Sequence, residues 1–285
     1  MTRPSLAQPR PNGIITLLTD FGLGDAYVAA VKGAVLSVAP SARLVDVTHL
    51  VPPQNVHHGA FLLGQAWRAF PPGTVHLAVV DPAVGTARRA LLLAGEGHFF
   101  VGPDNGLFTY ALWPRLMPAH PNRKPFSPFS APVPEGFVAY ALDQPRYWRQ
   151  PVSATFHARD VFGPVAAHLV AGARPDQLGT PTDQVTALSA PRAEWQGDVL
   201  EGLVLHVDTF GNLLTNVSAE AVAGRTVEMT VAGRAIRGVG RTYAESEGVV
   251  AVVGSNGFLE IAVAMGSAAR EMGAGVGAAV LVRQR

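Results

Sequence analysis

The chain has 285 residues, of which 48% are hydrophobic and only 15% charged, so a sizeable packed core is expected rather than disorder. Its formal net charge is +1 and it has no run of basic residues, which argues against a nucleic-acid partner. The absence of cysteine excludes disulfides, thiolate catalysis and cysteine-ligated zinc, and it favours a reducing compartment.

Residues 1–13 are polar and rich in proline, without the apolar stretch of a signal peptide. No apolar run in the sequence approaches the ~18 residues that a membrane-spanning helix needs. The sequence therefore predicts a cytoplasmic protein with no membrane partner.

Residues 14–175 alternate between strand and helix patterns, which predicts an α/β domain. Short apolar runs predict buried strands of a mostly parallel sheet, at residues 14–18, 44–47, 74–80, 91–94 and 99–101. Helical spacing of apolar side chains predicts flanking helices, at residues 27–38, 56–67 and 161–172.

The later part of the chain has a different composition. Residues 113–136 carry many prolines and no clear period, which predicts a long surface insertion or lid without core elements. Residues 176–197 are polar, and we predict that they form a linker. Several short apolar runs between glycine-containing turns then predict a small all-β barrel domain over residues 198–285.

Acidic side chains follow three of the predicted strands. Asp20 comes after the first strand, Asp81 after the third, and Asp104 after the strand at 99–101. Because ligands of open α/β sheets bind beyond the carboxyl ends of the strands, these residues predict a ligand site at that edge. Taken singly, each is explained equally well as a helix cap or a turn residue.

Two basic residues follow Asp81 across a tight loop. The guanidinium of Arg88 would meet the Asp81 carboxylate and hold it ionised, although the spacing suits Arg89 equally well. The alternative is a surface ion pair of little consequence.

Histidines occur at two places of interest. His157 precedes a predicted amphipathic helix, where a histidine can act as a base or orient one, or simply bond a backbone group. His57 and His58 are adjacent on a predicted helix and point about 100° apart, so we expect surface positions rather than a shared metal.

Six short motifs occur in order along the chain. They are LTDFG at 18–22, VVDPAVGTARR at 79–89, GPDNGL at 102–107, TFHARD at 155–160, VDTFGN at 207–212 and GSNG at 254–257. The set closely resembles the S-adenosyl-L-methionine hydroxide adenosyltransferases, which are relatives of the bacterial fluorinases and chlorinases. The likeness extends over about residues 14–283.

The resemblance implies an N-terminal α/β domain and a C-terminal β-barrel domain. It also implies a homotrimer whose active sites lie between the N-terminal domain of one subunit and the C-terminal domain of the next. The implied reaction is hydrolysis of S-adenosyl-L-methionine to adenosine and L-methionine, by attack of an activated water on the ribose 5′ carbon. No metal and no other cofactor are implied.

The resemblance also implies roles for individual residues. The implied catalytic set is Asp81, Arg88 and His157, and their presence favours water over halide because the halogenating relatives lack this set. Ala83 and Ala158 stand where the family usually has glycine, which bears on local loop geometry. The implied substrate-binding residues are Asp20, Asp25, Asn105, Phe156, Asp208, Phe210, Asn212, Ser255 and Asn256.

Three alternative functions remain at this point. The first is a halide-using adenosyltransferase, and the second is a non-catalytic protein that binds adenosine or S-adenosyl-L-methionine. The third sets the resemblance aside and is a metal-dependent phosphohydrolase built on Asp20, Asp81, Asp104 and His157.

Overall fold

The structure is a computed structural model that describes residues 10–113, 115–116, 124–189, 192–245 and 248–285. The chain divides into two compact units. The first comprises residues Met1–Met117 and Phe126–Leu188, and the second comprises Pro118–Pro125 and Ser189–Arg285.

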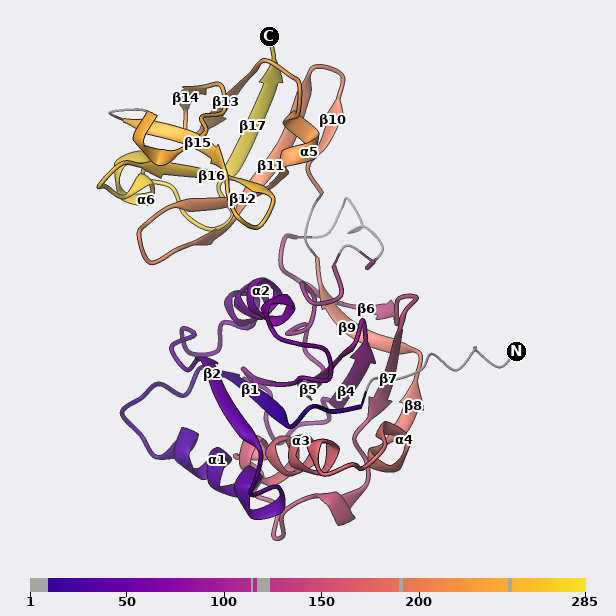
Figure 1. Ribbon diagram of the computed structural model, residues 1–285. Helices are drawn as coiled ribbons and strands as arrows, with labels where there is room; N and C mark the ends of the chain where they lie inside the picture. Colours follow the sequence, from indigo (N-terminus) through magenta and orange to yellow (C-terminus); the bar gives the residue numbers. More distant parts are fainter. Residues whose placement is uncertain (1–9, 114, 117–123, 190–191, 246–247) are drawn as a thin grey trace. The chain divides into compact units, whose positions relative to one another are not determined.

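A seven-stranded sheet forms the centre of the first unit (Figure 1). In sheet order, its strands are β2 (Arg43–Thr48), β1 (Ile14–Thr19), β3 (Val75–Val79), β5 (His98–Pro103), β4 (Ala90–Gly95), β7 (Phe137–Ala141) and β8 (Thr180–Thr182). Strands β2, β1, β3 and β5 pair in parallel, whereas β5, β4, β7 and β8 pair antiparallel.

The sheet is therefore mixed, and the prediction of a mostly parallel sheet holds for only half of it. The cause is a two-residue turn, because Glu96 and Gly97 both have positive φ, at 49° and 87°. Such a turn reverses the chain directly, so β4 and β5 must pair antiparallel. β1, β3 and β5 remain adjacent and parallel.

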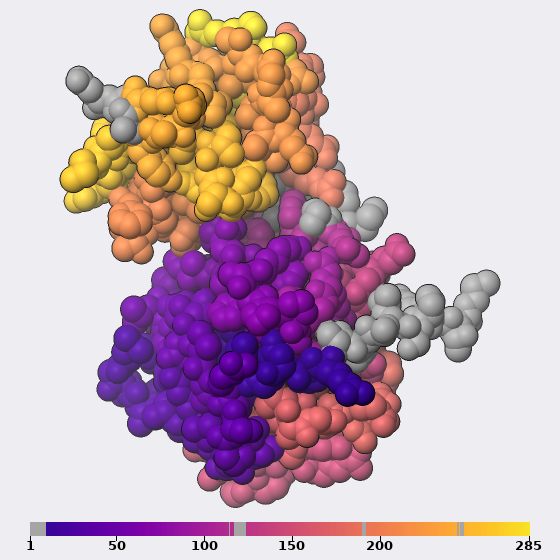
Figure 2. All heavy atoms as spheres, in the orientation of Figure 1, coloured from indigo at the N-terminus to yellow at the C-terminus, as the bar shows by residue number. Residues whose placement is uncertain are grey.

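Helices pack on both faces of this sheet (Figure 1). Helices α1 (Tyr27–Val38) and α3 (Gly163–Val170) share one hydrophobic core with Leu17 of β1, while α2 (Val56–Ala66) shares the other with Leu18. Successive side chains of a strand point to opposite faces, so a buried strand must be apolar throughout. In this unit, indigo and purple segments from early in the chain lie beside pink and salmon ones from later (Figure 2).

The segment predicted to lack core elements contains a strand. β6 (Pro128–Pro132) pairs antiparallel with β9 (Gln184–Leu188), and Ala131 is buried. The prediction failed there because proline argues against a strand and because the partner strand is distant in the sequence. Residues 114 and 117–123 of the same segment lie outside the described residues.

The predicted linker at 176–197 is also more structured than expected. Most of α4 (Pro175–Leu178), together with β8 and β9, falls within it and belongs to the first unit. β8 is short and polar, and β9, in which Val185 and Ala187 are buried, pairs with the distant β6, so neither has the continuous apolar run that marks a central strand.

The second unit is built on antiparallel strands that form a nearly closed, barrel-like sheet. In sheet order its strands are β14 (Arg234–Arg237), β13 (Val227–Val231), β17 (Ala279–Gln284), β11 (Val199–Val207), β12 (Leu213–Ser218), β16 (Phe258–Val263) and β15 (Val249–Val253), with β10 (Glu194–Gln196) beside β11. A bridge between Gly240 and Val252 links the two ends of this order. The predicted α/β domain followed by a β-barrel domain is confirmed.

Short helical elements complete the chain. They are η1 (Trp67–Ala69), η2 (Pro145–Tyr147), the π-helical turn η3 (Ala158–Phe162), α5 (Ala219–Val222), η4 (Tyr243–Glu245) and α6 (Ala268–Met272). The predicted helix at 161–172 corresponds to the end of η3 and to α3. Within the described residues, no helix has the length and apolar character needed to span a bilayer.

Candidate active site

A cavity of about 610 Å³ lies at the sheet edge where β1 and β3 end. Asp20 directly follows β1 and Asp81 lies two residues beyond the end of β3, and both side chains line this cavity. Asp104 follows β5 at the same edge but is not part of the lining. A cavity therefore lies at the edge where a ligand site is expected, and two of the three carboxylates line it.

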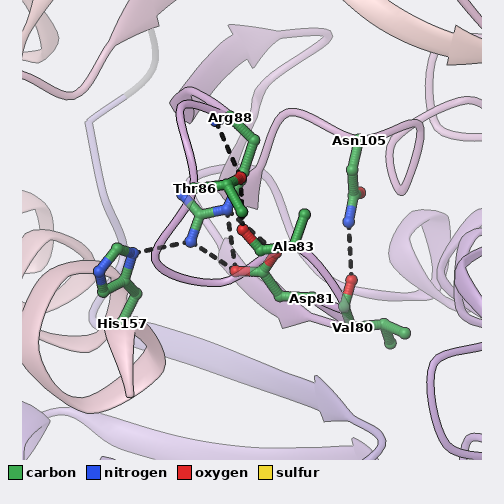
Figure 3. A network of polar contacts seen from close by, with 7 residues as sticks. All are labelled: Val80, Asp81, Ala83, Thr86, Arg88, Asn105 and His157. Carbon is green, nitrogen blue, oxygen red and sulfur yellow. Dashed lines mark hydrogen bonds and ion pairs between the residues drawn. The ribbon is translucent and has the colours of Figure 1, made fainter. Parts of the chain in front are cut away.

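Asp81 and Arg88 form a buried ion pair across the loop that joins β3 to β4 (Figure 3). Two consecutive turns, from Asp81 to Val84 and from Ala83 to Thr86, fold the loop back on itself. Arg88 Nε then donates to both carboxylate oxygens, at 3.0 and 2.9 Å, and Nη2 donates to Oδ2. This bidentate contact fixes the orientation of the carboxylate.

The same guanidinium also contacts His157 (Figure 3). Arg88 Nη2 lies 2.8 Å from His157 Nδ1. Because arginine stays protonated, Nδ1 must be the acceptor, and the neutral imidazole carries its hydrogen on Nε2. Burial and the charge of Arg88 lower the pKa of His157, against the opposing effect of Asp81 and Asp160. The geometry thus favours neutral His157 in a single tautomer.

Arg89 has a different partner, which resolves the ambiguity left by the sequence. Its Nε donates to Asp104 Oδ2 at 2.8 Å, and its other nitrogens reach Thr182 and the carbonyl of Gln184. Asp104 Oδ1 accepts the backbone N–H of Thr186 at 2.6 Å. Asp104 therefore ties β9 to the sheet edge, and its bonds are structural.

Asp20 is held by a backbone contact and by its neighbour on β1. Its Oδ2 accepts the N–H of Gln54 at 2.8 Å, and Gln54 has a positive φ of 65°. Thr19 bonds His49 Nδ1 at 2.8 Å, and His49 Nε2 lies 3.1 Å from Asp46 Oδ1. The contacts of Thr19, His49 and Asp46 anchor the turn that carries Asp20.

Aromatic rings form one wall of the cavity. Phe156, which the sequence indicated, packs at near-perpendicular angles against Phe21 and Tyr27, with ring centroids 5.9 and 5.4 Å away. The guanidinium of Arg159 lies 4.9 Å from the Phe156 ring centroid and also lines the cavity. Phe21, Tyr27, Gln54 and Arg159 also line the cavity but were not among the residues predicted from the sequence. Phe21 and Arg159 lie inside the motifs at 18–22 and 155–160 and could have been predicted there.

Two further candidates of the first unit lie away from this cavity. Asp25 is exposed and is not part of its lining. The Asn105 amide donates to the carbonyl of Val80 at 2.8 Å and accepts the N–H of Leu107, which stabilises the turn after β5. Asn105 lines an adjoining cavity that shares Gln54 with the first.

The candidates of the second unit lie on two turns. Asp208 accepts the N–H groups of Phe210 and Asn212, and also the side-chain amide of Asn212 at 2.9 Å. Ser255 and Asn256 occupy the turn between β15 and β16. Leu213 pairs with Ile261 and Ser218 with Phe258, so the two turns lie at opposite ends of the six-residue strands β12 and β16. Within this unit they do not form one cluster.

The proposed metal-ligand set is not assembled. Arg88 lies between Asp81 and His157, and Arg89 neutralises Asp104, so cations already occupy the contacts that a metal would need. No group of three or more acidic, histidine or cysteine side chains in the described ranges is arranged to hold a metal ion. His57 bonds Tyr110, and its ring packs against Phe126.

Both domains of one known protein family match this sequence. The chain matches the SAM hydroxide adenosyltransferase N-terminal domain over residues 15–179 and the corresponding C-terminal domain over residues 202–281. The chain belongs to the SAM hydroxide adenosyltransferase family. Three of its six motifs contribute Asp20, Asp81, Phe156 and His157 to one cavity of the first unit.

Individual relatives show how far the family likeness extends. A Thermus thermophilus protein named (R)-S-adenosyl-L-methionine hydrolase is 42% identical over 269 residues, which cover 91% of this chain and 95% of the relative. A fluorinase of an Actinoplanes species is 29% identical, with 72% of each chain covered. The crystal structure of an uncharacterized conserved protein from Thermotoga maritima superimposes with a TM-score of 0.82 at 29% identity. That superposition covers 94% of this chain and 99% of the other.

Proposed function

We propose that this protein hydrolyses S-adenosyl-L-methionine to adenosine and L-methionine. The observation that carries the proposal is the contact of one guanidinium with both Asp81 and His157, beside a cavity that Asp20 also lines. The hydrolase relative described above supports the same substrate, while the fluorinase relative defines the competing reaction.

The chemistry requires a well-placed nucleophile more than an activated leaving group. Water attacks the ribose 5′ carbon, the carbon–sulfur bond breaks, and its electron pair leaves with sulfur as the neutral thioether of methionine. Water is a weak nucleophile, so an enzyme contributes mainly by holding it in line with that bond. Such positioning can lower the activation barrier by up to ~7–11 kcal/mol in well-oriented systems.

The hydrogen bonds of the site suggest a role for each member of the set. His157 Nδ1 is occupied by Arg88, so its Nε2–H is a donor that can orient the oxygen of the water. The Asp81 oxygens accept from Arg88 but retain further lone pairs, so Asp81 accepts the proton that the attacking water loses. That proton then passes to solvent, which restores the site.

Asp20 suits a binding role. With Oδ2 oriented by the Gln54 N–H, its carboxylate can accept hydrogen bonds from the ribose hydroxyls. The wall formed by Phe21, Tyr27 and Phe156 offers apolar area to the rest of the nucleoside. These contacts would exist in both the ground state and the transition state, so they bind substrate rather than accelerate the reaction.

Product identification tests the proposal. Purified protein is incubated with S-adenosyl-L-methionine in the presence of a chelator and without halide, and the nucleoside is identified by chromatography and mass spectrometry. In ¹⁸O-water we expect adenosine whose 5′ oxygen carries the label, because water attacks the ribose 5′ carbon. The chelator should not prevent the reaction, because this scheme needs no metal or other cofactor. Formation of 5′-chloro-5′-deoxyadenosine when chloride is added, or recovery of intact substrate only, would contradict it.

We further propose a homotrimer whose active sites draw on two subunits. Support comes from the division of the candidate binding residues between the two units and from large exposed apolar side chains of the second unit. Phe210 is 76% exposed and Met265 is fully exposed. Mixing Asp20→Ala subunits with Asn212→Ala subunits should then restore part of the activity. A monomeric mass by light scattering at the assay concentration would contradict this assembly.

A further inference from the structure

The loop that carries His157 is closed by a single buried carboxylate. Asp160 lies three residues beyond His157, on the π-helical turn η3, and its side chain is fully buried. Oδ1 accepts from Arg159 Nε at 2.7 Å and from Arg149 Nη1 at 3.3 Å. Oδ2 accepts from Arg159 Nη2 at 2.8 Å and from the backbone N–H of Ser153 at 2.9 Å.

The backbone of Asp160 closes the same loop a second time. Its carbonyl accepts the N–H of Arg149 at 2.8 Å, so side chain and main chain together join both ends of residues 149–160. Between these ends, Ser153, Phe156 and His157 line the cavity. A buried carboxylate with four donors destabilises the folded protein if any of these partners is lost, because its charge is then left incompletely hydrogen-bonded. The loop geometry therefore depends on Asp160.

Asp160 also acts on His157 through its charge. The charged groups around the imidazole are Arg88 and Asp81 from the β3–β4 loop, together with Asp160 and its partner Arg159 from η3. Burial and Arg88 lower the pKa of His157, and the negative charge of Asp160 opposes that effect. Loss of the Asp160 charge would lower this pKa further.

We propose that Asp160 is a positioning residue for the hydrolysis, because it holds the 149–160 loop in the conformation that brings His157 Nδ1 to Arg88. This inference rests on the proposed function of the site. Asp160 does not line the cavity, so it acts through His157 and not on the substrate.

The test compares two carboxylates with the same kind of partner. Asp160→Asn removes the charge and one acceptor from the buried site. Asp176→Asn is the matched control, because Asp176 also accepts Nε and Nη2 of a nearby arginine, Arg174, but in an exposed pair. We expect Asp160→Asn to lower kcat at least tenfold with KM within about threefold, and Asp160→Glu to restore part of the rate. Asp176→Asn should match the wild type.

Imidazole titration by ¹⁵N NMR, without substrate, provides the readout that a purely structural role would not change. We expect loss of the signature of an Nδ1 acceptor in Asp160→Asn and a changed pKa of His157, because the Asp160 charge and the contact with Arg88 are lost together. If that variant fails to fold, Arg149→Met removes an exposed partner of the same carboxylate and should reduce kcat more mildly. A folded Asp160→Asn, or Arg149→Met in its place, with unchanged His157 titration and unchanged kcat would overturn the proposal. The titration result holds even if the wild type proves inactive on S-adenosyl-L-methionine.

Discussion

Gly85 and Ala154 are in direct backbone contact, and they join the two loops that carry the candidate catalytic residues. Gly85 lies between Asp81 and Arg88 and has a φ of +78°. A Cβ atom at this position would come within 2.3 Å of the Ala154 carbonyl oxygen, on the loop that leads to His157. Only glycine allows both the backbone conformation and the close approach. The distance between Arg88 and His157 therefore depends on this contact.

Gly85→Ala should separate these loops and weaken the contact between Arg88 and His157. We expect kcat to fall at least tenfold, because a displacement of ~1 Å in positioned groups can cost 10²-fold. Strain should also lower the free energy of unfolding by about 1–3 kcal/mol. Gly172→Ala is the control, since Gly172 has a φ of +102° with no atom near its Cβ position. Equal effects of both substitutions on kcat would contradict a specific role for the loop contact.

Asp81 and Asp20 should differ in the step that they affect. Asp81→Asn keeps the shape but removes the charge and the proton acceptor, so we expect a loss of rate on the order of 10²-fold or more with little change in affinity. Asp20→Ala should mainly weaken binding, because its contacts with ribose hydroxyls would persist from ground state to transition state.

Calorimetric affinities measured beside single-turnover rates separate the two effects. If Asp81→Asn loses affinity but keeps its single-turnover rate, Asp81 is a binding residue and the proposed proton transfer is wrong. If Asp20→Ala keeps its affinity, the ribose contact is wrong instead.

Much of the first unit could be predicted because its central strands are buried on both faces. Continuous apolar runs mark β1, β3, β4 and β5 without knowledge of their partners. The orientation of β4 depends on the turn at Glu96 and Gly97, which local hydrophobicity does not reveal. β6 and β9 escaped prediction because each is defined by a distant partner rather than by its own pattern.

The candidate site was likewise predictable only in part. The sequence indicated that Asp81 has an arginine partner, but Arg88 and Arg89 are adjacent and their side chains diverge, so spacing could not choose between them. Gln54 was missed because it acts on Asp20 through its backbone N–H, which any residue type could supply. The catalytic and substrate-binding roles, those of Asn105, Asp208 and Asn212 included, stay predictions.

The pH dependence of the reaction should reflect the lowered pKa of His157. The contact with Arg88 requires an unprotonated Nδ1, and protonation would place two cations in contact. Because burial and Arg88 lower this pKa below the ordinary 6.5, the neutral form of His157 predominates at pH 6.5 and the charged form gains weight as the pH falls. We expect kcat to be constant through neutral pH and to fall along an acidic limb whose midpoint lies below 6.5.

His157→Gln provides the control for that assignment. Its residual rate should be low and should lack the acidic limb, because glutamine does not titrate. A midpoint above 6.5 in the wild type would show that the charged imidazole is stabilised in the protein. A limb that persists unchanged in His157→Gln would belong to another group.

Asp104 should matter for stability and not for the reaction, although it ends a strand at the same edge as Asp20 and Asp81. Its side chain is 2% exposed and accepts both the Arg89 guanidinium and the Thr186 N–H. Asp104→Ala should lower the free energy of unfolding by about 1.5–3 kcal/mol, the range for hydrogen bonds to a charged group. The loss should stay below that of a fully buried pair, because Arg89 is 39% exposed and can be solvated.

Urea denaturation and steady-state kinetics distinguish the two roles of Asp104. Asp176→Ala removes an exposed carboxylate from a similar arginine pair and should cost less than ~1 kcal/mol. Because Asp104 lies outside the cavity lining, Asp104→Ala should keep kcat and KM within about threefold of the wild type at temperatures where it is folded. If the variant instead kept its stability and lost its activity, the Asp104 carboxylate would belong to the reacting site. The assignment of a catalytic role to the Asp81–Arg88 pair and a structural role to the Asp104–Arg89 pair would then be wrong.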